Sequence, residues 1–84
     1  MVYTIKISRI FERDFSGLDS ITQSRVMVAL EKIRINPFLN VKKLSQVNVG
    51  VFRLRIGDYR LRFDIFKHDI YLYCIRHRKD VYRK

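Results

Sequence analysis

Arginines alternate with apolar residues between Phe52 and Phe66, in the segment FRLRIGDYRLRFDIF, and a histidine, more basic residues and a tyrosine follow before the end of the sequence. Guanidinium groups offer paired donors to phosphate, and aromatic rings offer surfaces on which bases stack. A protein face that collects both predicts a binding site for a polyanion. The alternative is a solvated basic face without a ligand, which describes most clusters of charge.

The alternation has the two-residue period of a strand with one buried and one exposed face. Gly57-Asp58 is predicted to form a tight turn that joins two strands, so that Arg55 lies opposite Arg60 and Arg53 opposite Arg62. A second tight turn at Lys67-His68 is expected to begin a third strand. The pairs expected across it are Ile65 with Ile70, Phe63 with Leu72, Leu61 with Cys74, Arg62 with Tyr73 and Arg60 with Ile75. The resulting polar face carries Arg53, Arg55, Arg60, Arg62, Tyr71, Tyr73 and His77.

Arginines that face each other do not help the sheet to form. Like charges directly opposite each other destabilise a sheet by up to about 1 kcal/mol per pair. Asp64 is expected to relieve part of this repulsion. Together with the tyrosines on the same face, the arrangement favours the anion site over the solvated face.

Length and composition indicate a single domain over residues 1–84. The 84 residues are 48% apolar and 13% aromatic, and 18 basic against 8 acidic residues give a formal net charge of +10. Such an excess of positive charge points to nucleic acid, the ribosome surface or an acidic protein as partner. A membrane fits less well, because no long uncharged run and no apolar signal segment is present, and we expect a cytoplasmic protein. The single cysteine, Cys74, excludes an internal disulfide and is predicted to be a small buried residue on the core face.

The rest of the sequence predicts the elements that must support this face. Residues 2–8 alternate like a strand, and a short helix should follow with Phe11, Phe15 and Leu18 on one stripe and an end near Gly17. A second helix should start at Asp19-Ser20 and end before Asn36-Pro37, while residues 36–50 form an extended connection. The apolar stripe of this second helix consists of Val26, Ala29, Leu30 and Ile33. The predicted fold is α+β: a mainly antiparallel four-stranded sheet in the order β-α-α-β-β-β, with a helical hairpin on one face.

The chemistry that such a face supports is limited by the residues that the sequence contains. His68 and His77 lack a cluster of carboxylates, no glycine-rich phosphate loop is present, and no nucleophile with a paired base is visible, so we expect no metal and no cofactor. Metal-free cleavage of RNA remains, in which the substrate's own 2′-hydroxyl attacks the phosphate. Arginines can bind the phosphate and stabilise developing charge, but they are very poor bases.

Proton transfer needs other groups, and two candidates are apparent. Histidine is the side chain suited to proton transfer near neutral pH, which makes His77 one candidate, and Tyr82 would need help from nearby cations. A structural or merely exposed imidazole is an equally good interpretation of His77. Tyr71 and Tyr73 suit a scaffold or a stacking platform better than an acid or base. Further contacts to RNA are expected from Arg62, Tyr71, Tyr73, Lys42, Lys43 and Lys79.

Several of these segments together resemble the RelE/ParE toxin superfamily. The resemblance rests on the Asn-Pro after the helical hairpin, a Lys-Lys-Leu connection, the run FRLRIGDYR from Phe52 to Arg60, and the closing IRHRKDVY. For RelE-like members it implies a small cytoplasmic toxin of a type II toxin–antitoxin pair, which cleaves messenger RNA in the ribosomal A site without metal. It also implies a RelB-like antitoxin, typically acidic, that wraps around the toxin and neutralises it.

The resemblance also suggests roles for individual residues. Arg53 and Arg55 stand where RelE-like toxins have basic residues on the first hairpin strand, and Arg60 matches a phosphate-binding arginine. The basic residue before the C-terminal tail is matched by Arg76 or Arg78, and Tyr82 matches a tyrosine that orients the reacting nucleotide. Arginine at both strand positions leaves no lysine there to act as a base, which makes His77 a stronger candidate for proton transfer.

Two other functions remain open at this point. ParE-like relatives share the fold but poison DNA gyrase through protein contacts, and a degenerate toxin would bind its antitoxin without cutting RNA. The combination of Arg60, the His77-Arg78 segment and Tyr82 favours the nuclease, because ParE-like proteins generally lack it as a set.

Overall fold

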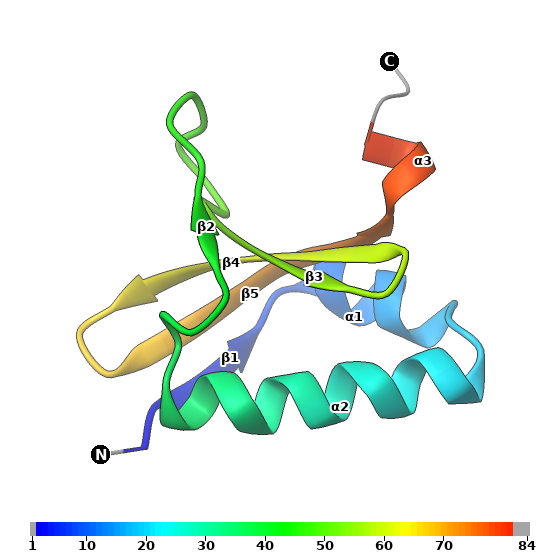
Figure 1. The fold of residues 1–84 in the computed structure, drawn as a ribbon, viewed down its shortest axis with the longest axis horizontal. Coiled ribbons are helices and arrows are strands. Elements are labelled where there is room, and N and C mark those ends of the chain that lie inside the picture. The colour runs from blue at the N-terminus through cyan, green and yellow to red at the C-terminus, as the bar shows by residue number, and fades with distance from the viewer. Residues whose placement is uncertain (1, 82–84) are drawn as a thin grey trace.

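The computed structural model describes residues 2–81 as two layers, a sheet and a pair of helices against one face of it (Figure 1). In chain order the elements are β1 (Thr4–Ile7), α1 (Arg9–Ser16), α2 (Ser20–Ile35), β2 (Lys42–Lys43), β3 (Phe52–Ile56), β4 (Tyr59–Phe66), β5 (Asp69–His77) and α3 (Arg78–Val81). The predicted α+β class is confirmed. None of the helices described is both long and apolar enough to cross a membrane.

Side chains cap both helices of the hairpin near the predicted starts. Ser8 Oγ accepts a hydrogen bond from the Phe11 N–H at 3.0 Å, and Asp19 Oδ1 accepts one from the Thr22 N–H at 3.2 Å. These contacts satisfy N–H groups that have no partner within the helix. Because α1 ends at Ser16, Leu18 does not belong to its stripe and packs against the core from the connection that follows.

The sheet has five strands in the order β1-β5-β4-β3-β2, where four were predicted. β1 runs parallel to β5, and the other neighbours are antiparallel. The additional strand, β2, lies within the expected extended connection and pairs Lys42 with Arg53 and Lys43 with Phe52. The prediction missed it because a strand of two residues has no periodicity to detect.

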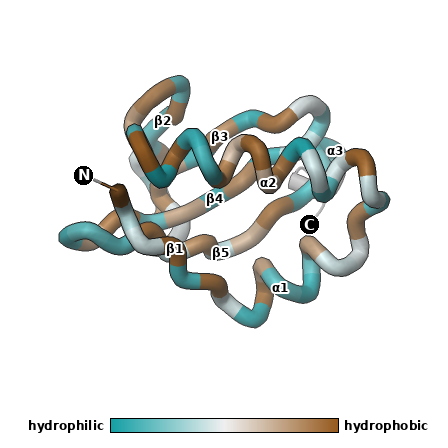
Figure 2. The backbone as a smooth tube through the Cα atoms, turned by 90° about the horizontal axis from the view of Figure 1, so that it is seen from below, coloured by the Kyte–Doolittle hydropathy of each residue, from teal (hydrophilic) through white to brown (hydrophobic). Residues whose placement is uncertain are grey.

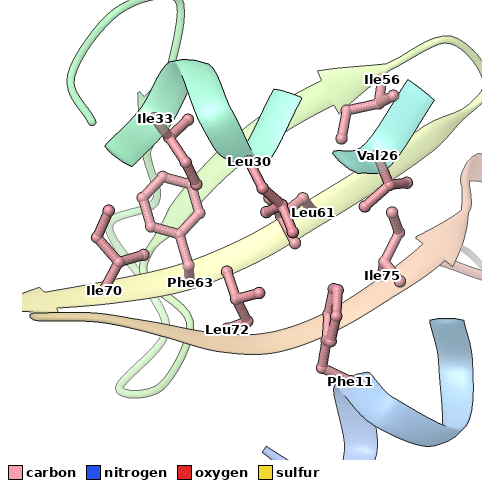
Figure 3. Close-up of a cluster of buried hydrophobic side chains, with 10 residues drawn as sticks. All are labelled: Phe11, Val26, Leu30, Ile33, Ile56, Leu61, Phe63, Ile70, Leu72 and Ile75. Atoms are coloured by element: carbon pink, nitrogen blue, oxygen red, sulfur yellow. The ribbon is translucent and has the colours of Figure 1, made fainter. Parts of the chain in front are cut away.

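Helices α1 and α2 enclose the core against one face of the sheet (Figures 1 and 3). Hydrophobic and hydrophilic residues alternate along both layers, as the tube in Figure 2 shows. The buried cluster consists of Phe11, Val26, Leu30, Ile33, Ile56, Leu61, Phe63, Ile70, Leu72 and Ile75. The opposite face of the sheet, which we call the open face, is covered by neither of these helices. The loop between β2 and β3 and the short α3 rise on this side (Figure 1).

A β-bulge in β5 changes which residues reach the open face. Pairing runs as predicted through Ile65 with Ile70 and Phe63 with Leu72, and then continues with Arg62 opposite Cys74, which skips Tyr73. The predicted pairs beyond this point are wrong by one residue: the observed ones are Arg62 with Cys74, Leu61 with Ile75, Arg60 with Arg76 and Tyr59 with His77. An extra residue in one strand shifts every later side chain to the other face.

The bulge therefore corrects two predictions about the faces of β5. His77 lies opposite Tyr59, on the helix side of the sheet, and Arg76 takes the position opposite Arg60 that was predicted for Ile75. Cys74 is buried as predicted, with 4% of its surface exposed, but it pairs with Arg62 and is not part of the core cluster. Burial raises the pKa of the Cys74 thiol, which keeps it protonated and unreactive at neutral pH.

Candidate functional site

Three arginines form a row across the open face. Arg55 on β3 lies opposite Arg60 on β4, and Arg60 lies opposite Arg76 on β5. Neighbouring strands are about 4.8 Å apart, so the backbones at the two ends of this arginine row are separated by about 10 Å. Arg55 and Arg76 are exposed, and Arg60 between them is partly buried. The row offers a run of guanidinium groups to an anion that lies across the strands.

The next row of the open face contains Lys42, Arg53, Arg62 and Cys74. The two basic residues at its β2–β3 end lie where they can extend the positive surface of the arginine row. Lys43 pairs with Phe52 and falls on the opposite side of the sheet, so the predicted Lys42-Lys43 pair is split between the two faces.

Arg62 binds backbone carbonyl groups of the loop between β2 and β3. Its Nε donates to the Gly50 carbonyl at 2.9 Å, and its Nη2 donates to the Val49 carbonyl at 2.7 Å. The guanidinium also lies over the Tyr73 ring, 5.4 Å from the ring centroid. Both were predicted to contact RNA, yet here they hold one another and the β2–β3 loop. The geometry supports a scaffold role for both.

Asp64 fixes the same loop from the neighbouring position on β4. Its carboxylate accepts hydrogen bonds from the Gly50 N–H at 2.8 Å and the Val51 N–H at 3.0 Å. Asp64 was expected to relieve the repulsion between arginines, but its described hydrogen bonds are to backbone amides of the β2–β3 loop. Arg62 and Asp64 together attach the β2–β3 loop to the open face.

The end of β5 holds Arg76 through a residue that the sequence analysis missed. Asp14 Oδ2, on α1, accepts hydrogen bonds at 3.3 Å from both Arg76 Nε and the Ile75 N–H. This hydrogen bond raises the pKa of Arg76 further above its ordinary value, so the guanidinium stays charged. No local pattern marks Asp14, because the contact joins residues 62 positions apart in the sequence.

The last residue of β5 and the segment that follows it contact each other, β4 and the turn before β4. His77 Nδ1 accepts a hydrogen bond from the Lys79 N–H at 3.1 Å, and the imidazole stands edge-on to the Tyr59 ring at 5.2 Å between centroids. Arg78 Nε lies 4.0 Å from Asp58 Oδ1, and its N–H donates to the Asp58 carbonyl at 2.8 Å. Of the two alternatives for the basic residue before the tail, Arg76 is the one on the arginine row.

Two further predicted site residues lie outside this constellation. Tyr71 is exposed on the open face, where its hydroxyl donates to Asp69 Oδ2 at 3.2 Å. Desolvation and the negative charge of Asp69 raise the pKa of the Tyr71 phenol, which disfavours its use as a base. Lys79 is exposed on α3. Tyr82 lies outside the described residues. Within residues 2–81, no three His, Cys, Asp or Glu side chains gather closely enough to hold a metal ion.

A groove runs along β3, between this strand and α2. Its volume is about 670 Å³. Apolar side chains, among them Val28 and Leu39, line it together with the strand, and its basic lining residues are Arg25, Lys32, Lys42, Arg53 and Arg55. Acidic residues are absent from the lining among the residues that the structure describes. This groove suits an apolar segment that carries negative charge at its edges.

The fold matches that of solved bacterial and archaeal toxins. A chain of the toxin–antitoxin complex RelBE2 from Mycobacterium tuberculosis superposes with a TM-score of 0.82 at 24% sequence identity, over 92% of this chain and 99% of that one. A chain of the RelE–RelB complex from Pyrococcus horikoshii gives a TM-score of 0.79 at 21% identity, covering 93% and 97%. Toxin RelE from E. coli in the free state, with two arginines replaced by alanine, gives 0.72 at 17% identity, covering 95% and 87%.

These likenesses define the class of fold: the chain has the fold of the RelE toxins, as its sequence predicts. No protein-family model matches the sequence, and no curated protein is significantly similar to it. The agreement therefore lies in the three-dimensional arrangement, and the function has to be argued from the residues on the open face.

Proposed function

We propose that this protein is the toxin of a type II toxin–antitoxin pair, and that it is a cytoplasmic, ribosome-dependent endoribonuclease that works without metal. The observation that carries the proposal is the arginine row, in which Arg55, Arg60 and Arg76 cross three neighbouring strands of the open face. The RelE fold and the net charge of +10 support it, because a surface of this charge favours the polyanionic ribosome and its message.

The proposed reaction uses the 2′-hydroxyl of the message as nucleophile. The 2′-oxygen forms a bond to the adjacent phosphorus while the bond from phosphorus to the 5′-oxygen breaks, which leaves a 2′,3′-cyclic phosphate and a 5′-hydroxyl. Arg55, Arg60 and Arg76 hold the phosphate and stabilise the extra negative charge of the transition state. Arg53 and Lys42 bind the flanking backbone at the edge of the sheet.

One proton must leave the 2′-hydroxyl and another must reach the 5′-oxygen. His77 and Tyr82 are the candidates from the sequence. His77 fits this task less well than expected, because the bulge places it on the helix side and its Nδ1 accepts from the Lys79 N–H. The proposal therefore gives Tyr82 precedence and keeps His77 as the alternative.

An acidic RelB-like antitoxin is the proposed protein partner. Two of the structures that share the fold are complexes, the toxin–antitoxin complex RelBE2 from Mycobacterium tuberculosis and the RelE–RelB complex from Pyrococcus horikoshii. The groove between α2 and β3 supports the proposal from this chain's own residues, because it combines an apolar lining with a basic rim. Charge complementarity of this kind speeds association and selects among partners.

The proposal is tested by incubating the purified protein with a translated message, with and without ribosomes, and mapping the cuts by primer extension. Cleavage should require ribosomes and leave 5′-hydroxyl ends that a kinase can label directly. Growth arrest without cleavage of any message would move the target to DNA gyrase, as for ParE-like toxins. Neither arrest nor cleavage would identify an inactive toxin that only binds its antitoxin.

A further inference from the structure

Asp14 occupies an unusual position for a carboxylate beside a proposed phosphate site. It belongs to α1, in the helical layer, and only 13% of its side chain is exposed. β1 pairs with β5 only from Asp69 to Leu72, so the edge of β5 beyond this point has no neighbouring strand among the described residues. Asp14 reaches this edge and accepts from the Ile75 N–H and from Arg76 Nε, both at 3.3 Å.

The contact with Arg76 uses one nitrogen of the guanidinium and leaves the other two available. Arginine has five N–H donors, one on Nε and four on the terminal nitrogens. Among the described residues, the terminal nitrogens of Arg76 make no hydrogen bond, and 45% of the side chain is exposed. A guanidinium held by its Nε presents its outer edge in a fixed direction, which suits paired hydrogen bonds to a phosphate.

The charge of Asp14 works against simple attraction of RNA. A carboxylate next to the arginine row lowers the local positive potential and so weakens the binding of a polyanion. A positioning function offsets this cost, because a flexible arginine side chain loses rotational freedom when it binds a phosphate, and an ion pair formed in advance removes part of that loss.

We propose that Asp14 is a positioning residue that orients Arg76 toward the scissile phosphate. The inference rests on the proposed nuclease function and assigns a task to a residue that does not contact the RNA itself. Asp14 also binds the Ile75 N–H, so a purely structural function at the β5 edge is the competing explanation. The two explanations differ in which kinetic constant changes and in whether the effect depends on Arg76.

The test compares Asp14→Asn with Glu12→Gln in steady-state cleavage of message on ribosomes. Both substitutions remove one negative charge from α1, but Glu12 is exposed and its side chain forms no hydrogen bond or ion pair with β5 among the described residues. Asn keeps the size and an acceptor oxygen, so the fold should be retained. We expect kcat to fall about ten- to a hundredfold for Asp14→Asn with KM unchanged or lower, and Glu12→Gln to keep the wild-type kcat.

A double substitution separates positioning from support of the backbone. If Asp14 acts through Arg76, Asp14→Asn combined with Arg76→Ala should be no slower than Arg76→Ala alone. Arg76→Lys, which keeps the charge but lacks Nε, should be slow and insensitive to Asp14→Asn. An unchanged kcat in Asp14→Asn, or losses that multiply in the double variant, would overturn the inference. An inactive wild-type protein would instead overturn the proposed function, and the inference with it.

Discussion

Residue 50 requires glycine for two separate reasons. Its φ of +61° lies in the left-handed region, and a Cβ added there would lie 2.7 Å from Tyr73 Cδ2 and 3.2 Å from Arg62 Cβ. The positive φ would strain the backbone of any other residue, and the added Cβ would push the β2–β3 loop away from the open face. The loop and the bulged strand therefore fit together only through the absence of a side chain.

Gly50→Ala should accordingly destabilise the protein by about 1–3 kcal/mol, measured as the free energy of unfolding in urea. Gly17→Ala is the matched control, because the chain at Gly17 has a negative φ of −84° and an added Cβ would meet its nearest neighbour, the Asp14 carbonyl oxygen, at an ordinary 3.6 Å. Equal stability of the two variants would show that the loop does not rest on Tyr73 as described.

Single residues were predictable from the sequence where the pattern was local. The alternation placed Arg53, Arg55 and Arg60 on one face, and the register of the first hairpin confirms it. The partners of Asp14 and Asp64 were not predictable, because each contact spans a long stretch of chain and depends on how the loops and helices dock. The sequence could not show whether Arg62 binds carbonyls of the loop or remains available to RNA.

At the scale of elements, the bulge in β5 decides which residues share a face. The sequence of β5 alternates through Leu72 and then continues with Tyr73, Cys74 and Ile75, which fits either register equally well. Two anchors favour the bulged register: Ser8 Oγ donates to the Tyr73 carbonyl at 2.7 Å, and Asp14 accepts from the Ile75 N–H. Because both come from the N-terminal part of the chain, a strand-by-strand reading could not reveal them.

The start of α2 makes the stability of the protein depend on pH. Hydrogen bonds from Thr22 hold the pKa of Asp19 below its ordinary value of 3.8. A carboxyl group with a lowered pKa stabilises the folded state when it is ionised, so its contribution is complete above the unfolded pKa and is lost as pH falls through the folded one.

Asp19→Asn should therefore lose less stability than the wild type between about pH 4 and pH 2, because Asn caps the helix without titrating. Thermal unfolding of both proteins across this range measures the effect. The difference between their midpoints should shrink or reverse as the solution becomes more acidic. A constant difference between the two midpoints at every pH would mean that the ionisation of Asp19 does not contribute to the pH dependence of stability.

At the scale of the whole molecule, the sheet separates stability from the proposed chemistry. One face carries the buried cluster against α1 and α2 (Figures 1 and 3), and the other carries the arginine row. The β2–β3 loop and α3 rise on the side of the arginine row (Figure 1). The sequence predicted this division into two faces and most of the elements. It missed β2 and the bulge, which are set by packing between segments distant in the chain.

The division also explains why the central claim can be tested without disturbing the fold. Removal of a side chain from the open face leaves the buried cluster intact, and oriented charges in a site typically contribute about a hundredfold or more to the reaction rate. Arg60 is the middle member of the arginine row, so its loss leaves a gap between Arg55 and Arg76.

The most direct measurement is the single-turnover rate of message cleavage on ribosomes for wild type, Arg60→Ala and Arg9→Ala. Arg9 is exposed on α1, in the helical layer, and provides a control with the same change of charge. We predict that Arg60→Ala slows cleavage at least about a hundredfold with little change in the free energy of unfolding, whereas Arg9→Ala stays within about twofold of wild type. Cleavage at the wild-type rate by Arg60→Ala would contradict the arginine row as the reaction site.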